Sequence, residues 1–397
     1  MKITTYLEKK EDLAFYQDIS EVILQVKELS RFGKLTLEEA HELAHLAKLK
    51  GITPVLEWDI LMTENVFQET LKVIHQIDFS LFAEVRAQDP GAISWLQENR
   101  TETKIALILE TGNHNFLGIQ SWCKHIGKQL SKVILSIELP HERLKTYIDE
   151  LHESQIQVEL LGLGRILLFY TPRSLLMPVV FDHEDKKEKI IHHDLVERLA
   201  SSEESPHKGF PVVETRHGTF MFHIKDHWLM ENIFDLQAMK LDWVRIDLRF
   251  GKPKQLMKNI ISLIQQYNPE AALQLKNDYP ADVIKGFFNV NKTDTLFGKL
   301  KNMKLQRKDK NYIGDVYEVI KEDSIIFMNR NKDLKVLKGM ELVIINPDGK
   351  EIPVTIKKLK NSEGSDVESI SYEELAIINP VASVVARSQV YLKDLSE

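Results

Sequence analysis

The chain has 397 residues, a formal net charge of −7, 43% hydrophobic and 28% charged residues, and one cysteine, Cys123. This length predicts one large domain plus a smaller one, and the acidic balance argues against a surface that binds nucleic acid throughout. A single cysteine excludes a disulfide framework, an all-cysteine metal site and an iron–sulfur cluster built from one chain. Because no apolar run approaches the roughly 20 residues that span a bilayer and no signal peptide follows Met1, we expect a cytoplasmic protein without membrane contact.

Short apolar strands alternate with amphipathic helices from the start of the chain. Thr36 and Glu39 have the spacing of a helix capping box, and Gly51 ends that helix. Further helices are predicted at Asn65–Ile74, Asp89–Leu96, Phe116–Leu130 and His141–Leu151. The predicted strands are Glu21–Val26, Thr53–Trp58, Ser80–Val85, Lys104–Leu109, Lys132–Ile137, Gln157–Leu161 and Trp243–Leu248. This alternation predicts right-handed β-α-β units and a parallel sheet.

Charged residues stand at or near the carboxyl ends of most of these strands. In a closed barrel such positions converge on one face, where ligand sites of (β/α) barrels gather. Five consecutive strands with acids at their ends favour a TIM-like (β/α) barrel over residues 1–298, although an open doubly wound sheet has the same pattern. The fold expected for the whole chain is this α/β barrel followed by a small antiparallel β-barrel.

Residues 181–205 interrupt the alternation with a charged, serine-rich segment, interpreted as an excursion from the barrel. Its histidines, His183, His192 and His193, match no metal-ligand spacing, so no metal is expected. After it, Lys225-Asp226-His227 is typical of a helix N-cap and first turn, which predicts a helix through Met239.

Several separated segments are similar to motifs of the collagenase-like peptidase U32 family. The family's E-x-F-x-H-G-A-L-C-x-x-Y-S-G-R-C-L-L pattern resembles the stretch from Glu159 to Leu176, with a glycine, a tyrosine, an arginine and a leucine pair in register. Its G-T-Y-x-x-x-S-K-D-L-C-x-I-E pattern resembles Gly218–Glu231, and its K-I-E-G-R resembles Arg245–Arg249. With further matches in residues 30–39 and 330–349, the resemblance covers nearly the whole chain.

The resemblance implies several activities. Members are labelled proteases, or help to hydroxylate tRNA, ribosomal RNA or ubiquinone precursors, and many hold an iron–sulfur cluster with four cysteines. Two of those cysteine positions carry Leu167 and Ser174 here, and neither side chain replaces a thiolate toward iron. We therefore expect no cluster and no other cofactor, and a protein that binds a polar ligand or a partner and supports an RNA or small-molecule modification pathway.

The same segments supply candidate site residues. Glu159 and Asp247 are a candidate acid–base pair for a hydrolase, which is the alternative that the peptidase label implies. Arginine recognises anionic groups through its bidentate fork, so a small polar or anionic ligand is expected in the barrel mouth. The candidate ligand-binding residues are Arg165, Tyr170, Arg173, Arg245, Arg249, Glu57 and Glu110. The competing interpretation of these charges is a buried ion-pair network without a ligand.

The pattern at the end of the chain predicts a separate unit. Residues 299–313 are a predicted basic linker, in which Lys299–Lys310 has six basic residues and one acid. It is either a solvated linker or a contact to an RNA backbone, and the second option makes an RNA-binding accessory factor a third hypothesis. Residues 314–397 contain short strands, with Asp348-Gly349 as a hairpin turn, and predict the small antiparallel β-barrel. Another U32-family protein is the remaining partner that the resemblance suggests.

Overall fold

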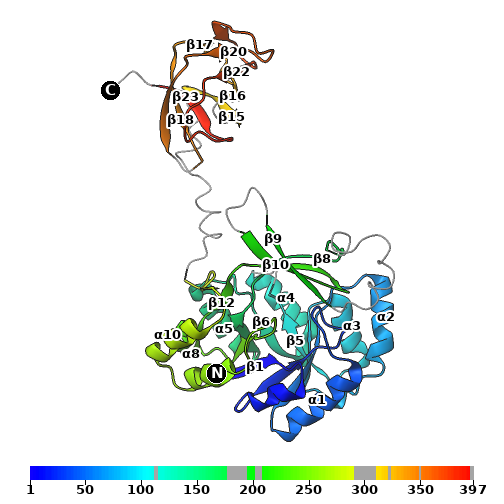
Figure 1. Ribbon diagram of the computed structural model, residues 1–397. Coiled ribbons are helices and arrows are strands. Elements are labelled where there is room, and N and C mark those ends of the chain that lie inside the picture. Colours follow the sequence, from blue (N-terminus) through cyan, green and yellow to red (C-terminus); the bar gives the residue numbers. More distant parts are fainter. Residues whose placement is uncertain are drawn as a thin grey trace. The chain divides into compact units, whose positions relative to one another are not determined.

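The computed structural model describes residues 1–110, 115–176, 195–201, 208–289, 310–320, 323–347 and 350–393. The chain divides into two compact units, residues 1–291 and 292–397 (Figure 1). Residues 299–309 of the predicted linker, the Asp348-Gly349 turn and the histidines at 183, 192 and 193 lie outside the described residues.

Eight parallel strands close into a barrel in the first unit. In spatial order they run from β13 through β1 to β7, and β13 pairs with both β1 and β7, so the ring is closed. This confirms the predicted TIM-like barrel and excludes the open sheet. The strands are β1 (Lys2–Tyr6), β2 (Glu21–Leu24), β3 (Thr53–Trp58), β4 (Glu84–Ala87), β5 (Lys104–Ile108), β6 (Leu130–Ile134), β7 (Gln157–Gly164) and β13 (Trp243–Ile246).

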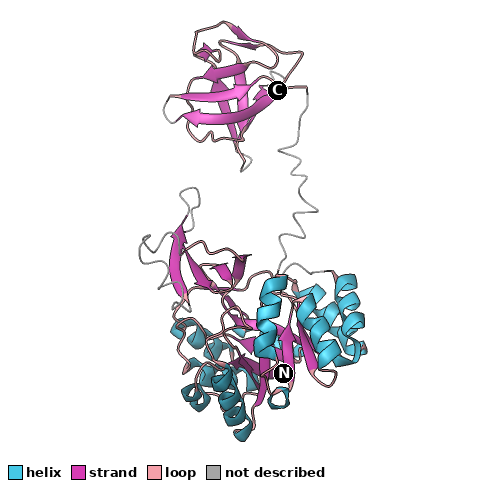
Figure 2. Ribbon diagram, turned by 90° about the vertical axis from the view of Figure 1, so that its right-hand side faces the viewer, coloured by secondary structure: helices cyan, strands magenta, loops and turns pink. Residues whose placement is uncertain are grey.

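Helices alternate with the strands and surround them (Figure 2). The predicted capping box is confirmed: Thr36 Oγ1 accepts from the Glu39 N–H, and the Glu39 carboxylate accepts from the Thr36 N–H at 2.8 Å. The helices are α1 (Leu37–Leu49), α2 (Glu64–Ile74), α3 (Pro90–Asn99), α4 (Phe116–Ile126), α5 (His141–Glu153), α8 (Ile233–Ala238), α9 (Leu256–Gln265) and α10 (Pro269–Asp278). Single 3₁₀ turns are η1 (Lys10–Ala14), η2 (Phe79–Leu81), η3 (Gly127–Gln129) and η4 (Met230–Asn232).

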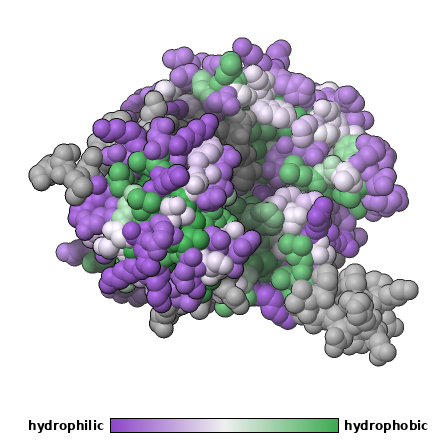
Figure 3. All heavy atoms as spheres, turned by 90° about the horizontal axis from the view of Figure 1, so that it is seen from above, coloured by the Kyte–Doolittle hydropathy of each residue, from purple (hydrophilic) through white to green (hydrophobic). Residues whose placement is uncertain are grey.

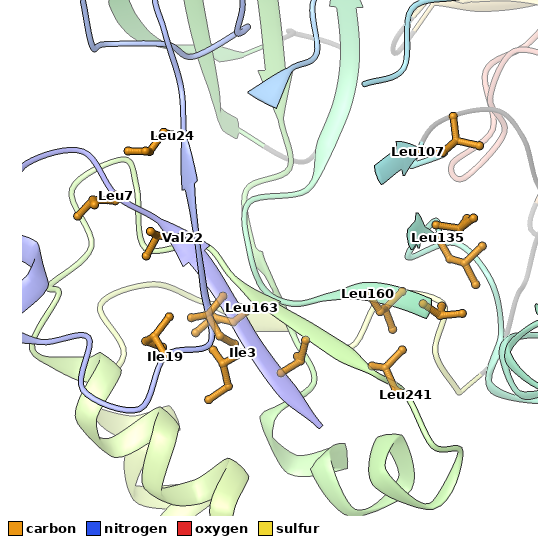
Figure 4. Packing of buried hydrophobic residues seen from close by; sticks show 14 of the residues in the cluster. Ile3, Leu7, Ile19, Val22, Leu24, Leu107, Leu135, Leu160, Leu163 and Leu241 are labelled. Atoms are coloured by element: carbon orange, nitrogen blue, oxygen red, sulfur yellow. The ribbon is translucent and has the colours of Figure 1, made fainter. Parts of the chain in front are cut away.

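The main hydrophobic core lies between the barrel and its helices. Figure 4 shows buried side chains from several strands and from the segments beside them, including Ile3 of β1, Val22 of β2, Leu107 of β5 and Leu160 of β7. Because these strands are covered by helices on one side and face the barrel axis on the other, both of their faces are buried, and small apolar clusters such as Tyr6, Ile23 and Val55 lie apart from the main core.

An antiparallel four-stranded sheet is inserted after β7. Its order is β8 (Leu167–Thr171), β11 (Gly218–Phe222), β10 (Lys208–Thr215) and β9 (Val196–Ser201), so the described part of the predicted excursion forms the strand β9. Val213, Phe220 and Phe222 of this sheet pack with Phe32, which follows β2. The inserted sheet is thereby attached to the loops at the carboxyl ends of the barrel strands.

The prediction of a helix from Lys225 to Met239 is wrong for the first half of this segment. Asp226–Trp228 forms strand β12, which pairs with the end of β7 and with β14 (Val283–Ile284). Only Ile233–Ala238 is helical. Hydrogen bonding to two strands that are distant in sequence overrides the local N-cap pattern.

The second unit is an antiparallel half-barrel sheet of seven strands, which corresponds to the predicted small β-barrel. Its core contains Ile313, Phe327, Leu342, Ile378 and Val390. The sheet consists of β19 (Glu351–Thr355), β18 (Glu341–Ile345), β23 (Gln389–Leu392), β15 (Tyr312–Ile320), β16 (Ser324–Met328), β22 (Leu375–Ile378) and β20 (Leu359–Lys360), beside a small pair, β17 (Val336–Leu337) and β21 (Ser369–Ile370).

Hydrophilic residues predominate on the face shown in Figure 3, with smaller hydrophobic groups among them. Among the described residues, no helix has both the length and the apolar character needed to cross a membrane.

Candidate functional site

A cavity of about 220 Å³ opens at the carboxyl ends of the barrel strands. The barrel contributes residues that end or follow β1, β2, β3, β5, β6, β7 and β13, and the inserted sheet contributes Leu167, Leu168 and Phe222. Charged and aromatic side chains share its wall. The charged ones are Arg31, Asp59, Glu110, Glu138, Arg165, Arg245, Asp247 and Arg249, and the aromatic ones are Tyr6, Phe32, Phe222, Phe250 and Phe287.

Each arginine of the cavity is held by a carboxylate. Arg31 Nε lies 2.6 Å from Asp59, Arg249 lies 2.7 Å from Asp247, and Arg165 lies 2.6 Å from Glu197 on β9. Arg245 pairs with Glu110 and lies 3.4 Å from Glu159. These pairs fix the guanidinium planes before any ligand arrives.

The Asp247–Arg249 pair is strongly biased toward its charged form. Burial alone raises the pKa of Asp247, but the charge and hydrogen bonds of Arg249 outweigh it and hold this pKa below its usual value. Burial likewise lowers the pKa of Arg249, and Asp247 outweighs that effect, so the net shift is upward. The pair is therefore an ion pair at neutral pH.

Two arginine nitrogens in the cavity wall lack a hydrogen-bond partner among the described residues. They are Nη1 of Arg165 and Nε of Arg245, and both atoms are buried. Burial and the nearby charge of Arg86 lower the pKa of Arg245, because its positive charge is incompletely compensated. A buried unpaired donor lowers stability, so each of these two N–H groups lacks an acceptor that would stabilise it.

Aromatic rings lie against two of the guanidinium groups in the cavity wall, those of Arg249 and Arg165. Arg249 stands 3.4 Å from the ring centroid of Tyr6, and Arg165 stands 4.5 Å from that of Phe250. Phe32 packs with Phe220, Phe222 and Phe250 at centroid distances of 4.6 to 5.7 Å. The wall is thus a rigid aromatic surface with arginine heads at its edge.

Below the cavity, a second set of charges fills the barrel interior. Arg86, whose side chain is fully buried, donates to both oxygens of Glu159 at 2.7 and 2.8 Å and to Glu57 at 3.0 Å. Lys132 joins Glu159, at 3.4 Å, to Glu21 and Glu84, at 2.9 and 3.0 Å. Glu159 and Glu57 belong to this network and do not line the cavity.

The two carboxylates on Arg86 are shifted in opposite directions. Burial raises the pKa of Glu159, but the charges of Arg86 and Lys132 outweigh it and leave a pKa below 4.5. For Glu57, burial and the charge of Asp59 prevail over the arginines, and its pKa is raised above 4.5. Of these two carboxylates, Glu159 is therefore firmly ionised and Glu57 holds its proton more readily.

The structure brings most of the candidate site residues together, but not all. Arg165, Arg245, Arg249, Glu110 and Asp247 line the cavity, with Glu57 and Glu159 in the barrel interior. Tyr170 and Arg173 do not line it. Tyr170 donates to the carbonyl of His217 and stacks on Phe220, and Arg173 is exposed on the turn after β8. Tyr170 lies on β8 of the inserted sheet and Arg173 comes just after that strand, so neither is carried by a barrel strand.

The sequence interpretation missed Arg31, Asp59 and the aromatic wall. The sequence did contain a signal for these residues, because Arg31-Phe32 belongs to one of the segments that resemble the family and Asp59 directly follows strand β3. The phenylalanines could not be assigned, since Phe222 and Phe250 come from different sheets and meet only in three dimensions.

The residues at the family's cysteine positions do not fit an iron–sulfur cluster. Leu167 packs against the aromatic cluster, and the Ser174 hydroxyl donates to Glu214, which also accepts the N–H groups of Leu175 and Leu176. Cys123 lies on α4, and burial raises the pKa of its thiol to about 11. In the described parts of the chain, no three His, Cys, Asp or Glu residues are placed to hold a metal ion. No step through a cluster is therefore derived for this chain.

A comparison with protein families matches residues 15–295 to peptidase family U32. No curated protein matches the sequence. Among solved structures, the U32 peptidase Mk0906 is similar over 64% of this chain and 94% of its own, at 13% identity and a TM-score of 0.36. A conserved protein of unknown function from Enterococcus faecalis is similar over 100% of this chain and 97% of its own, at 9% identity and a TM-score of 0.34. A class V chitinase from Pseudomonas fluorescens is similar over 69% and 98%, at 11% identity and a TM-score of 0.33.

Proposed function

The chain belongs to peptidase family U32, and we propose that it uses the mouth of its barrel to bind a small carboxylate that has an apolar body. The observation that carries this proposal is that two residues of the cavity wall, Arg165 and Arg245, each have a buried N–H group without an acceptor among the described residues. A ligand carboxylate supplies two acceptor oxygens, one for each of these donors.

The rest of the wall matches the remainder of such a ligand. The rings of Phe222, Phe250 and Phe287 and the aliphatic side chains of Leu161 and Leu168 line the same cavity. Sites of this kind, largely apolar with a few convergent polar groups, are typical of small-molecule binding. A free phosphate ion lacks an apolar body and leaves acceptor oxygens unpaired, so a carboxylate is the better match.

The hydrolase alternative finds less support in the geometry. A general acid or base needs an accessible oxygen and a pKa near the working pH. Both oxygens of Glu159 are occupied by Arg86 beneath the cavity, and Asp247 is held by Arg249, with lowered pKa values for both carboxyl groups. The proposal therefore treats Glu159 and Asp247 as charges that position arginines, not as an acid–base pair.

We also propose that the bound ligand serves a modification pathway. The resemblance to U32 proteins suggests support of an RNA or small-molecule modification pathway, carried out with a partner protein. RNA contact through Lys299–Lys310 stays a prediction, because only Lys310 of this stretch is described. Cytoplasmic location is likewise a prediction. Isolation of the full-length protein from cells, followed by mass spectrometry of co-purified small molecules, proteins and RNA, tests these points together.

Ligand binding is tested by calorimetry with benzoate, phenylacetate and hexanoate on the full-length protein. We expect saturable binding, and Arg165→Gln should weaken it at least about tenfold, because a charge-assisted hydrogen bond is worth about 1.5–3 kcal/mol. Arg198→Gln is the matched control, since Arg198 is an exposed arginine on neighbouring β9. Absence of binding for all three acids, or equal losses in both variants, contradicts the proposed function.

A further inference from the structure

Phe250 has a backbone conformation that is unusual for a bulky residue. Its φ is +57°, in the left-handed region, where a residue with a Cβ atom is strained by the nearby carbonyl oxygen. The next residue, Gly251, has a φ of +77° and adopts the same region without this strain. Strained residues persist only where their surroundings fix them, and they gather at functional sites. The strain at Phe250 therefore points to a role for its side chain.

Neighbouring residues hold Phe250 both at its backbone and at its ring. One residue earlier, the backbone N–H and Nε of Arg249 donate to Oδ1 of Asp247, at 3.0 and 2.9 Å. At the ring, Phe32 lies at a centroid distance of 5.3 Å and an interplanar angle of 84°, and Phe222 lies at 5.4 Å. These contacts come from separate segments of the chain, and together they fix the Phe250 ring in one place.

Phe250 lines the cavity and is less covered than the two rings that pack against it. Phe32 and Phe222 are only 7% and 3% exposed, whereas Phe250 is half-buried. The guanidinium group of Arg165 lies over the Phe250 ring, 4.5 Å from its centroid. Under the proposed function, a carboxylate held by Arg165 therefore places the apolar body of the ligand beside Phe250.

An aromatic wall distinguishes an aromatic ligand from a saturated one of the same carbon skeleton. Burial of apolar area gives no advantage to the aromatic ring, because a saturated ring buries at least as much apolar surface. Two aromatic rings attract each other further when they meet edge to face or offset, with centroids about 4.5–7 Å apart. Arginines that line the same cavity, such as Arg245 and Arg249, add a cation–π attraction for a ligand ring that lies over them.

We propose that Phe250 determines ligand specificity, its strained backbone holding the ring at the cavity so that the barrel mouth selects aromatic carboxylates over aliphatic ones. The inference rests on the proposed function, since it takes the ligand carboxylate to be bound by Arg165 and Arg245. It adds the chemical class of the ligand's apolar body, which is an aromatic ring, and the residue that recognises this ring.

The test compares phenylacetate with cyclohexylacetate, which has the same carbon skeleton and a saturated ring. Calorimetry on the full-length protein should show phenylacetate binding about three- to tenfold more tightly, as expected for one aromatic contact. In Phe250→Leu this preference should be lost while cyclohexylacetate binding changes little, because leucine keeps an apolar side chain at the cavity. Phe234→Leu on α8, where the ring is 67% exposed, is the matched control and should keep the full preference.

Two further variants separate the ring of Phe250 from its backbone. Phe250→Gly removes the ring and adopts the left-handed conformation without strain, so the preference should be lost here too, and the test does not depend on one variant folding. Phe250→Tyr keeps an aromatic ring at the same position and should retain the preference for phenylacetate.

Two kinds of failure are distinguishable in these measurements. If phenylacetate binds no more tightly than cyclohexylacetate to the wild type, or if the preference survives in Phe250→Leu or Phe250→Gly, the specificity role of Phe250 is wrong while the proposed function stands. If no carboxylate probe binds to the wild type, the proposed function fails and this inference falls with it.

Discussion

The cavity wall and the barrel interior below it are built from the same chemical groups but are organised differently. In the interior, Arg86 and Lys132 are surrounded by Glu21, Glu57, Glu84 and Glu159, and the side-chain nitrogens of both cations are engaged by carboxylates. In the cavity wall, Arg165 and Arg245 each have a buried side-chain nitrogen without a hydrogen-bond partner among the described residues, and the Phe250 ring lies beside Arg165. Charge alone therefore does not distinguish the two regions. They differ in the unpaired donors of the cavity wall, which are the basis of the proposed ligand site.

The contrast also separates two roles for the same residue type. An interior arginine that is fully compensated holds strands together, and removal of a partner leaves a buried charge. Under the proposed function, a wall arginine with an unpaired donor binds the ligand, so its removal should affect binding more than folding. The predictions below test this division, beginning with the largest expected effect.

Glu159→Gln should lower the free energy of unfolding by about 3–5 kcal/mol, because it leaves the buried charge of Arg86 without its main partner. Urea denaturation followed by circular dichroism measures this change. Glu153→Gln, at the exposed end of α5, is the matched control and should leave stability nearly unchanged. A small effect at Glu159 would contradict a structural role for the interior network.

The two carboxylates on Arg86 should respond to pH in opposite ways. Since the folded pKa of Glu159 lies below 4.5, its stabilisation is present above pH 4.5 and is lost as pH falls, so the loss caused by Glu159→Gln should shrink on acidification. The folded pKa of Glu57 lies above 4.5, so its contribution is present below that pH and is lost as pH rises through the folded pKa. The loss caused by Glu57→Gln should therefore shrink as pH rises.

Urea denaturation of both variants and of the wild type at a series of pH values gives these two trends. Parallel trends for Glu57 and Glu159 would mean that Arg86 compensates both carboxylates equally, and Glu57 would then not be the more easily protonated of the two.

Phe287→Ala should weaken binding of phenylacetate several-fold with little effect on folding, because this half-buried ring lines the cavity outside the hydrophobic core. Calorimetry measures the first effect and thermal unfolding the second. Phe234→Ala on α8, where the ring is 67% exposed, is the control and should change neither. Equal binding in the wild type and Phe287→Ala would remove this ring from the proposed site.

The smallest effect is expected for the exposed ion pairs. Lys145→Ala removes a 2.6 Å pair with Asp149 that is about half exposed on α5, and stability should be almost unchanged because exposed pairs contribute little. A clear loss, measured in the same urea series, would show that exposure is a poor guide to which charges of this protein hold the fold.

Local signals in the sequence were enough to predict the strands and helices and their parallel arrangement. Strand periodicity, the Thr36 capping box and charges at strand ends depend on near neighbours along the chain, and a parallel sheet follows from the alternation. The charges at strand ends favoured a closed barrel, but closure itself was established only by the pairing of β13 with β1 and β7. β1 was missed, since Thr4 and Thr5 face polar groups and interrupt the apolar run that marks other strands. Charged residues at strand ends also indicated Arg245, Asp247 and Arg249 before their positions were known.

Which of these charged residues line the cavity depends on the tertiary structure. Glu159 and Asp247 have the same pattern in the sequence, yet one is sealed below the cavity and the other lines it, because strand register and barrel tilt set their depth. Tyr170 and Arg173 do not line the cavity, because β8 pairs with β11, about 50 residues later, in a separate sheet.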